Sequence, residues 1–162
     1  DFGAGIPLVR VMPNVAATVG QSMTALTATR ATDAQVAAIR SLMDSVGRTI
    51  LIDEDYFPVF QALASCSPAW YFQIVDSFAR AGLKYGLSKD SAVEIAAQAM
   101  AGAAALLLAE REAGTIPAQL IDRVTSPGGT TIAGLLAAEE GGLSTALVGA
   151  VDASIHADSH LG

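Results

Sequence analysis

The sequence has few of the residues that form cross-links or basic surfaces. Cys66 is its one cysteine, so an intrachain disulfide is excluded and a reducing cytoplasm is expected. Lys and Arg number 9 against 16 Asp and Glu, which gives a formal net charge of -7. Because no basic cluster interrupts this acidic balance, we expect no nucleic-acid partner.

Charged side chains of either sign are also scarce. They make up 15% of the sequence, whereas hydrophobic residues make up 52%. An average globular chain is about 25% charged. A surface with so little charge is expected to be covered by other protein chains. We therefore expect an obligate oligomer.

Long apolar runs and targeting signals are missing as well. The most apolar run, Ala99–Ala109, is about half as long as a membrane-spanning helix, so no membrane partner is expected. Residues 1–9 lack the basic and apolar parts of a secretory signal. His156 and His160 are one helical turn apart, but they fall in the last seven residues. We interpret them as part of a solvated tail and predict no metal site.

Strand signals are confined to the first third of the chain. Three short β-prone runs are predicted to be strands: Leu8–Met12, Met23–Thr27 and Thr49–Ile52. Asp33–Val46 has the spacing of an amphipathic helix, with Thr32 as its N-cap and Gly47 as its stop. Three short strands make a poor sheet alone. We therefore interpret residues 1–53 as the tail of a larger α/β domain.

After residue 53 the strand signals end and helical periodicity replaces them. Six helices are predicted: Tyr56–Ala64, Pro68–Tyr85, Lys89–Ala113, Pro117–Arg123, Thr130–Glu140 and Leu143–Ala157. Ser67 and Ser88 are suitable N-caps for the second and third. The third is apolar nearly all round and is expected to be buried on most sides. The chain is thus predicted to be mainly α, with an all-helical domain at residues 54–162.

Val124–Ile132 is the most informative stretch. Two hydroxyl residues, a proline and two glycines lead into the predicted helix at Thr130. Free N–H groups and the helix dipole at such an N-terminus favour an anion. No lysine is present, so the loop lacks the cation of a triphosphate-binding loop and suits a small carboxylate. The alternative is a Gly-rich turn with Thr130 as an ordinary N-cap.

Other candidate residues follow strands or precede a helix. Glu54 lies at the end of the third predicted strand, either as part of a solvated acidic turn or at a ligand-binding edge. Asn14, shortly after Met12, is either a turn residue or faces a cofactor. Cys66 has no histidine nearby in the sequence to activate it. We interpret this cysteine as a small packing residue.

Four separated blocks resemble the pyrroline-5-carboxylate reductase family. In order they are Val9–Asn14; Phe60–Leu63 with Ser67–Ala69; Ala81–Leu83 with Gly86–Leu87; and Thr125–Thr131. The resemblance implies an N-terminal Rossmann domain that binds NAD(P)H and an all-helical domain that interlocks into a homodimer. Assembly into a higher oligomer of dimers stays open. Residues 1–53 are then the end of the Rossmann domain, and residues 54–162 are the dimerisation and substrate-binding domain.

The implied reaction is the NAD(P)H-dependent reduction of 1-pyrroline-5-carboxylate to L-proline. By resemblance, the substrate-binding residues are Glu54, Ser126, Gly128, Gly129, Thr130 and Thr131. Thr131 is the implied catalytic residue, which hydrogen-bonds the ring nitrogen. The implied cofactor-binding residues are Met12, Asn14 and Arg123, and most of the cofactor is expected to be held by the preceding domain. Reducing a cyclic imine needs positioning more than a strong general acid, which suits this loop.

One segment departs from the family pattern. Ser65-Cys66-Ser67 stands before Pro68 where the family has Gly-Ser-Gly, so a tighter pocket is expected. Two alternatives stay open. One is a related imine or hydroxyacid dehydrogenase, although the helical region has only Lys84 and Lys89 as lysines, without the glycine motif that accompanies a catalytic lysine. The other is a non-catalytic dimerisation module or paralogue. NADH and NADPH are not distinguished.

Overall fold

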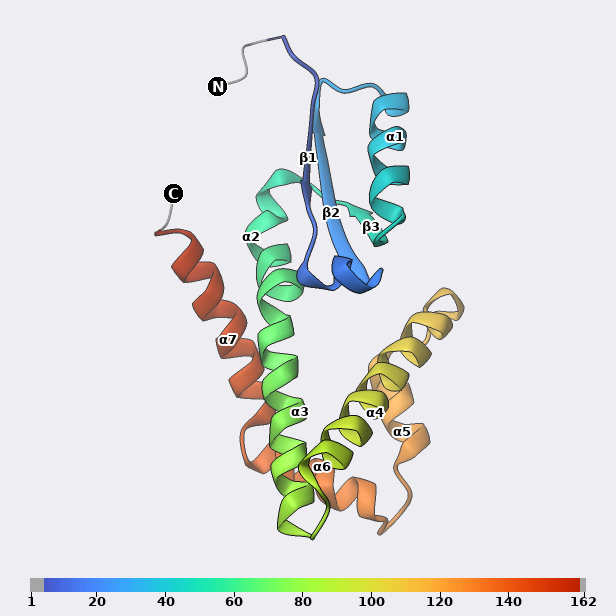
Figure 1. Ribbon diagram of the computed structural model, residues 1–162, viewed down its shortest axis with the longest axis vertical. Coiled ribbons are helices and arrows are strands. Elements are labelled where there is room, and N and C mark those ends of the chain that lie inside the picture. The colour runs from blue at the N-terminus through green and yellow to red at the C-terminus, as the bar shows by residue number, and fades with distance from the viewer. Residues whose placement is uncertain (1–4, 161–162) are drawn as a thin grey trace. The chain divides into compact units, whose positions relative to one another are not determined.

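The computed structural model describes residues 5–160. Residues 1–4 belong to the segment in which we expect no secretory signal, and they lie outside the described residues. Within residues 5–160 the chain is mainly α-helical, with three strands near its N-terminus (Figure 1). It forms two compact units. The first contains the residues up to Trp70 and those from Gly149 onward, and the second is Tyr71–Val148. The boundary predicted between residues 53 and 54 stays a prediction.

The first unit contains a three-stranded sheet. Its elements are β1 (Leu8–Met12), β2 (Ser22–Thr29), α1 (Asp33–Asp44) and β3 (Gly47–Leu51). The strand order is β1-β2-β3, with β1 antiparallel and β3 parallel to the central β2. Thr24, Ala25 and Leu26 of β2 are fully buried, as expected for a strand with a neighbour on each side and a crossover helix between β2 and β3.

All three predicted strands and the amphipathic helix are confirmed. The Thr32 hydroxyl accepts from the Gln35 N–H at 3.3 Å, and the Gln35 side chain accepts from the Thr32 N–H at 2.9 Å, so the predicted N-cap is a capping box. The prediction that Gly47 stops this helix is wrong. Ser45 ends the helix, and Gly47 begins β3 opposite Ser22 with φ 156°. A Cβ at Gly47 would collide with the Ser22 backbone, so only glycine permits this close pairing.

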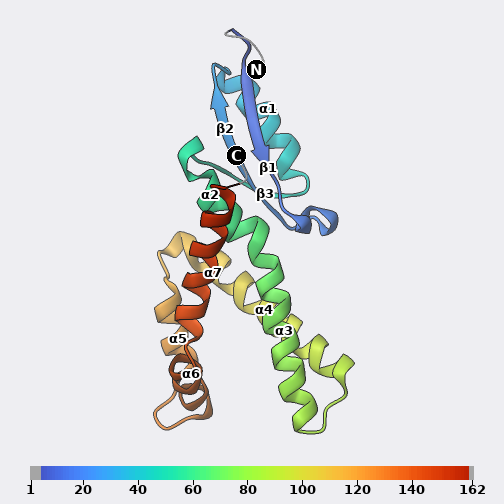
Figure 2. The same cartoon turned by 90° about the vertical axis from the view of Figure 1, so that its left-hand side faces the viewer.

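A predicted helix break is also wrong. α2 (Phe57–Phe60), a π-helical segment (Gln61–Cys66) and α3 (Ser67–Lys84) follow one another without interruption (Figure 2). Ser67 is therefore inside the helix and is no N-cap. Its hydroxyl donates back to the Leu63 carbonyl at 2.7 Å, and the residue is 4% exposed.

The reason lies in the way Pro68 is accommodated. Proline has no N–H, so in a regular α-helix it leaves the carbonyl four residues earlier without a donor. That carbonyl belongs to Ala64, and the Asn14 side-chain amide donates to it at 2.8 Å. The π-helical turn just before Pro68 changes the local backbone ladder at the same place. A contact between residues 50 positions apart thus helps the helix to continue through Pro68.

The second unit contains most of α3, then α4 (Lys89–Glu110), α5 (Pro117–Val124), α6 (Thr130–Glu140) and the start of α7 (Leu143–Asp158). The Ser88 hydroxyl accepts from the Ser91 N–H at 3.2 Å, which confirms this predicted N-cap. Helices α3 and α4 approach closely because their contact residues are small. A Cβ on Gly82 would lie 2.7 Å from the Cβ of Ala92.

Helix α4 is far less covered than the sequence led us to expect. Together with the following turn it is long and apolar enough to cross a membrane, by length and composition alone, and 6% of its most apolar window is buried. The apolar run Ala99–Ala109, on which the expectation of no membrane partner was based, is shorter than this helix. The prediction that this helix is buried on most sides is therefore wrong for the single chain. A surface this apolar is typically covered by another molecule.

Candidate functional site

The loop before α6 is built around a tight turn. The Ser126 carbonyl accepts from the Gly129 N–H at 3.0 Å, and Gly128 has φ 67°. Proline at the second position and a left-handed glycine at the third are the features of a type II turn. A Cβ on Gly129 would collide with the Ser126 hydroxyl. The two glycines thus serve different purposes, the first for backbone conformation and the second for close approach.

This turn delivers an uncapped helix N-terminus. Gly129 is the N-cap of α6, has an extended backbone and supplies no side-chain hydrogen bond. The alternative in which Thr130 is an ordinary N-cap is therefore wrong, because Thr130 is already the first helical residue. Thr130 and Thr131 are exposed, and their hydroxyls form no hydrogen bond within residues 5–160. The loop thus presents donors without side-chain partners, as an anion site requires.

An ion pair lies beside the entrance to this loop. Arg123 Nη1 donates to Glu110 Oε2 at 2.6 Å and to Oε1 at 2.8 Å, and the Thr115 hydroxyl donates to Oε2 at 3.2 Å. The hydrogen bond from Arg123 is the largest cause of a lowered pKa of the Glu110 carboxyl, with a smaller contribution from Thr115 and partial burial acting against both. The predicted cofactor residue Arg123 is therefore already engaged within the chain, and its cofactor role stays a prediction.

In the first unit, Glu54 is also paired. It forms an ion pair with Arg10 of β1, whose guanidinium carbon lies 4.4 Å from the centroid of the Phe57 ring. Phe57 is 2% exposed, so the cation stacks on an anchored aromatic surface. These contacts join β1 to Glu54, in the short turn before α2, and to Phe57, the first residue of α2. The predicted contact of Glu54 with substrate stays a prediction.

Asn14 is used by the fold itself, so its turn role is confirmed. Its side-chain oxygen accepts from the N–H groups of Ala16 at 3.3 Å and Met23 at 3.4 Å, while its amide nitrogen donates to Ala64. Met12 is the last residue of β1. Cofactor contacts by Met12 and Asn14 stay predictions.

The predicted site residues thus fall into two groups. Met12, Asn14 and Glu54 belong to the first unit. The second unit contains Arg123, Ser126, Gly128, Gly129, Thr130 and Thr131. The sequence analysis missed Arg10 and Glu110, because their partners are 44 and 13 residues away. Arg10 lies in the middle of β1 and Glu110 at the end of α4, and no local sequence signal identifies the partner of either.

The segment that departs from the family pattern contains an unsatisfied group. The Ser65 hydroxyl oxygen is buried and has no hydrogen-bond partner within the described residues. Its neighbour Cys66 is a half-buried free thiol. Both lie in the π-helical segment, so the substituted residues occupy a locally irregular helix.

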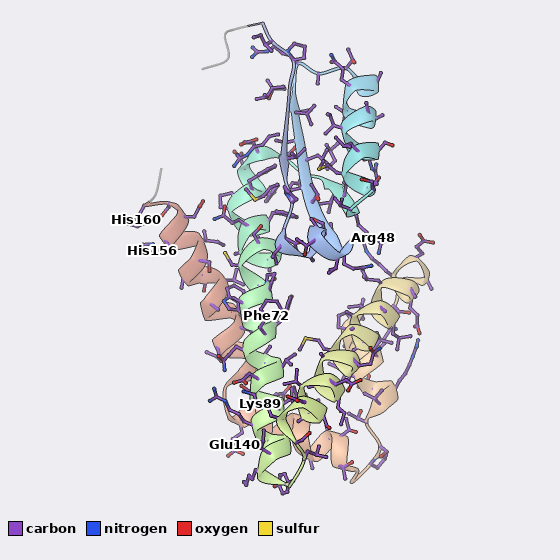
Figure 3. All side chains as sticks on the ribbon, viewed as in Figure 1. Arg48, Phe72, Lys89, Glu140, His156 and His160 are labelled. Carbon is purple, nitrogen blue, oxygen red and sulfur yellow. The ribbon has the colours of Figure 1, made fainter. Side chains whose placement is uncertain are left out.

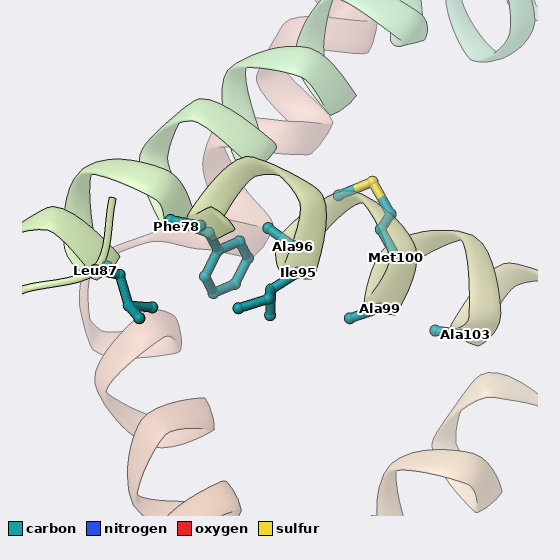
Figure 4. Close-up of a pocket in the computed structure, with 9 residues that line it drawn as sticks. Phe78, Leu87, Ile95, Ala96, Ala99, Met100 and Ala103 are labelled. Atoms are coloured by element: carbon teal, nitrogen blue, oxygen red, sulfur yellow. The ribbon is translucent and has the colours of Figure 1, made fainter. Parts of the chain in front are cut away.

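Apolar pockets open along α3 and α4 in the second unit. One of about 460 Å³ is lined by Phe78, Gly82, Leu87, Ala92, Ile95, Ala96, Ala99, Met100 and Ala103 (Figure 4). Another, of about 590 Å³, includes Tyr71 and Phe72. The Phe72 side chain is 68% exposed (Figure 3). Such a continuous apolar face is typical of a surface that another protein covers.

The two histidines near the end of α7 lie side by side (Figure 3). Their ring centroids are 4.4 Å apart, and His160 Nδ1 is 2.7 Å from the His156 carbonyl oxygen. Within residues 5–160 no group of three His, Cys, Asp or Glu side chains is arranged to hold a metal ion.

These features define a class of protein in which an α/β segment is followed by helices. The helices have an uncovered apolar face, and a Gly-rich loop leads into one of them. A family model described as pyrroline-5-carboxylate reductase dimerisation matches residues 54–161. The Mycobacterium tuberculosis pyrroline-5-carboxylate reductase is 39% identical, over 93% of this chain and 56% of the relative. The chain belongs to the pyrroline-5-carboxylate reductase family.

Solved structures agree with this assignment. The reductase from Streptococcus pyogenes is 40% identical with a TM-score of 0.85, over 95% of this chain and 59% of that protein. A Plasmodium falciparum pyrroline carboxylate reductase with NADP bound is 25% identical with a TM-score of 0.87, over 99% of this chain and 64% of that protein. The chain thus spans somewhat more than half the length of these relatives.

Proposed function

We propose that the protein containing this sequence reduces 1-pyrroline-5-carboxylate to L-proline with a nicotinamide cofactor. Membership of the family supports the reaction. The observation that carries it is the Ser126–Thr131 loop, whose turn leads to a helix N-terminus without a side-chain cap. The substrate has one carboxylate, and this is the group that such an N-terminus binds.

The roles of the loop residues follow from the chemistry of the substrate. The backbone N–H groups of Gly128, Thr130 and Thr131 and the hydroxyl of Ser126 hold the carboxylate, while the Gly129 N–H closes the turn. The Thr131 hydroxyl hydrogen-bonds the ring nitrogen. A protonated imine carbon is already electrophilic, so the chain has to orient it rather than provide a strong acid. When bound, a nicotinamide cofactor would supply a hydride for the imine carbon, and the nitrogen would keep its proton as the amine forms.

The fit of the chain to a nicotinamide cofactor can be judged at β1. Met12 is the last residue of β1 and Asn14 follows it, so both lie where the chain leaves the sheet. Asn14 fixes the backbone there through its own hydrogen bonds. We therefore propose that Met12, Asn14 and Arg123 contact the cofactor and that Glu54 contacts the substrate.

We further propose that a second copy of the chain covers the apolar face of α3 and α4. The dimerisation model spans both helices, and the pockets along them have almost wholly apolar walls. A homodimer in the cytoplasm satisfies this surface without a membrane. Sedimentation at micromolar concentration tests the proposal, since a stable monomer would exclude it.

The activity is tested by cofactor oxidation with 1-pyrroline-5-carboxylate as substrate, using the complete protein. We expect turnover that depends on both compounds. The competing function is a non-catalytic dimerisation module, which the departure of Ser65-Cys66-Ser67 from the family pattern favours. A stable dimer without turnover would support that alternative and overturn the reductase proposal.

A further inference from the structure

Glu110 occupies a junction in the second unit. As the last residue of α4 it accepts hydrogen bonds from Thr115, in the turn that follows, and from Arg123, near the end of α5. Its side chain is 27% exposed, against 54% for Arg123. One half-sheltered carboxylate therefore ties α4 to the end of the next helix.

The helix held in this way is short and lies between two turns. α5 contains eight residues, too few to be stable without tertiary contacts. Before it lies Gly114 with φ 79°, and after it comes the loop containing Gly128 with φ 67°. Both glycines have a left-handed backbone, so the chain changes direction on each side of α5. The ion pair is thus a specific polar anchor between α5 and α4.

The position of α5 is transmitted directly to the loop. Arg123 precedes the last residue of α5, and the Thr125 hydroxyl donates to the carbonyls of Ile121 at 3.0 Å and Asp122 at 3.3 Å. Thr125 has an extended backbone, and its hydroxyl ties this first residue of the loop back to the last turn of α5. Ser126, whose carbonyl closes the tight turn, is the next residue.

We propose that Glu110 is a positioning residue that, through Arg123, holds the end of α5 and thereby sets the loop Ser126–Thr131 in its anion-accepting conformation. The identity of the anion rests on the proposed function, whereas the restraint on the loop does not. Glu110 itself contacts no substrate. Its effect is on the geometry of donors that belong to other residues.

Kinetics of the complete enzyme test this role through a double-mutant cycle. Glu110→Gln is expected to raise the KM for 1-pyrroline-5-carboxylate by about two- to five-fold, as for a partly exposed ion pair, with little change in kcat. Arg123→Gln should raise this KM at least as much, because Arg123 is also a proposed cofactor residue. The double variant should be no worse than Arg123→Gln alone, because both substitutions remove the same ion pair. Arg123→Lys should restore part of the affinity.

Two matched controls remove a charge elsewhere. Glu140 and Arg111 are exposed, and their side chains form no hydrogen bond or ion pair within residues 5–160. Glu140→Gln and Arg111→Gln should leave the KM for 1-pyrroline-5-carboxylate and the KM for the cofactor unchanged. If Arg123→Gln instead raises the KM for the cofactor while Glu110→Gln leaves every constant unchanged, Arg123 acts on the cofactor directly and the proposal is overturned.

Hydrogen exchange separates this proposal from the proposed function. In Glu110→Gln, the amides of residues 128–131 should exchange about two- to five-fold faster than in the wild type, whereas those of the β2 core should not change. This readout needs no turnover. If the wild type has no reductase activity, faster loop exchange still supports the anchoring role. Unchanged loop exchange would overturn it even in an active enzyme.

Discussion

The two units of this chain differ in how the groups of their candidate sites are paired, although Arg123 in the second unit is paired with Glu110. In the first unit, the candidate side chains are satisfied internally, since Glu54 pairs with Arg10 and Asn14 bonds three backbone groups. In the second unit, the α6 N-terminus has no side-chain cap and α4 is almost uncovered. The first unit is thus built to hold its own geometry, and the second to receive other molecules.

This difference indicates where mutations should affect stability and where they should affect binding. A substitution in the first unit breaks interactions that exist within one chain, so it should lower the free energy of unfolding. A substitution in the loop of the second unit removes a group with no partner in the chain, so it should affect ligand affinity alone. The predictions below follow this division.

The largest expected effect is in the sheet of the first unit. Gly47→Ala places a Cβ against the Ser22 backbone and should lower the free energy of unfolding by about 2–4 kcal/mol, from overpacking and backbone strain. Denaturant unfolding measures it. Gly20→Ala is the matched control, because its φ is 70° but its Cβ meets nothing. It should cost about 1 kcal/mol, and an equal loss in both would contradict the collision.

The next effect concerns catalysis in the second unit. Thr131→Ala should lower kcat/KM for 1-pyrroline-5-carboxylate by about 10- to 150-fold, because a hydrogen bond to a charged group contributes about 1.5–3 kcal/mol. Its thermal midpoint should hardly change, since this hydroxyl has no partner within residues 5–160. Thr131→Ser should be much milder. Wild-type kcat/KM in both variants would make Thr131 merely a residue at a helix start.

A smaller effect is expected at the junction of β1 and the π-helical segment. Asn14→Ala leaves the Ala64 carbonyl without its side-chain donor and should destabilise the protein by about 1–3 kcal/mol. Pro68→Ala provides a helical N–H for that carbonyl and should reduce this penalty when the two substitutions are combined. Purely additive unfolding free energies would show that Asn14 does not compensate for Pro68.

The smallest effect is the pH dependence of the α3–α4 turn. The hydrogen bond from Lys89 is the largest cause of a lowered pKa of Asp76, supported by Arg80 and opposed by partial burial. Because its pKa is lowered, ionised Asp76 stabilises the fold above the ordinary value of 3.8. This stabilisation is lost as the pH falls through the lowered pKa. Thermal midpoints between pH 7 and pH 2 should therefore fall more for the wild type than for Asp76→Asn. Parallel curves would show that this pair does not contribute.

The sequence predicted those elements whose signals are local. The α1 and α4 N-caps, the three strands and the start of α6 each depend on neighbouring residues, and the structure confirms them. The break before Pro68 was predicted from an equally local rule and was wrong, because Asn14 lies 50 positions away. Gly47 was misassigned for the same reason, since its partner Ser22 belongs to another strand.

The candidate site was predictable to a similar extent. The loop before α6 could be located from its proline and glycines, because a type II turn has a sequence signature. The ion pairs of Glu54 and Glu110 could not be predicted, since their partners are distant in the sequence and surface charges have no spacing rule outside a helix. What covers α4 could not be predicted either, because the single chain leaves this helix almost uncovered.

The central claim is that the α6 N-terminus binds a carboxylate, and ligand titration of the complete protein with bound cofactor tests it most directly. L-proline should shift the Gly128 and Gly129 amide resonances and bind at least tenfold more tightly than L-prolinamide, since about 1.5–3 kcal/mol separates hydrogen bonds to a charged group from their loss. Equal affinity for acid and amide, or shifts confined to other residues, would contradict the account.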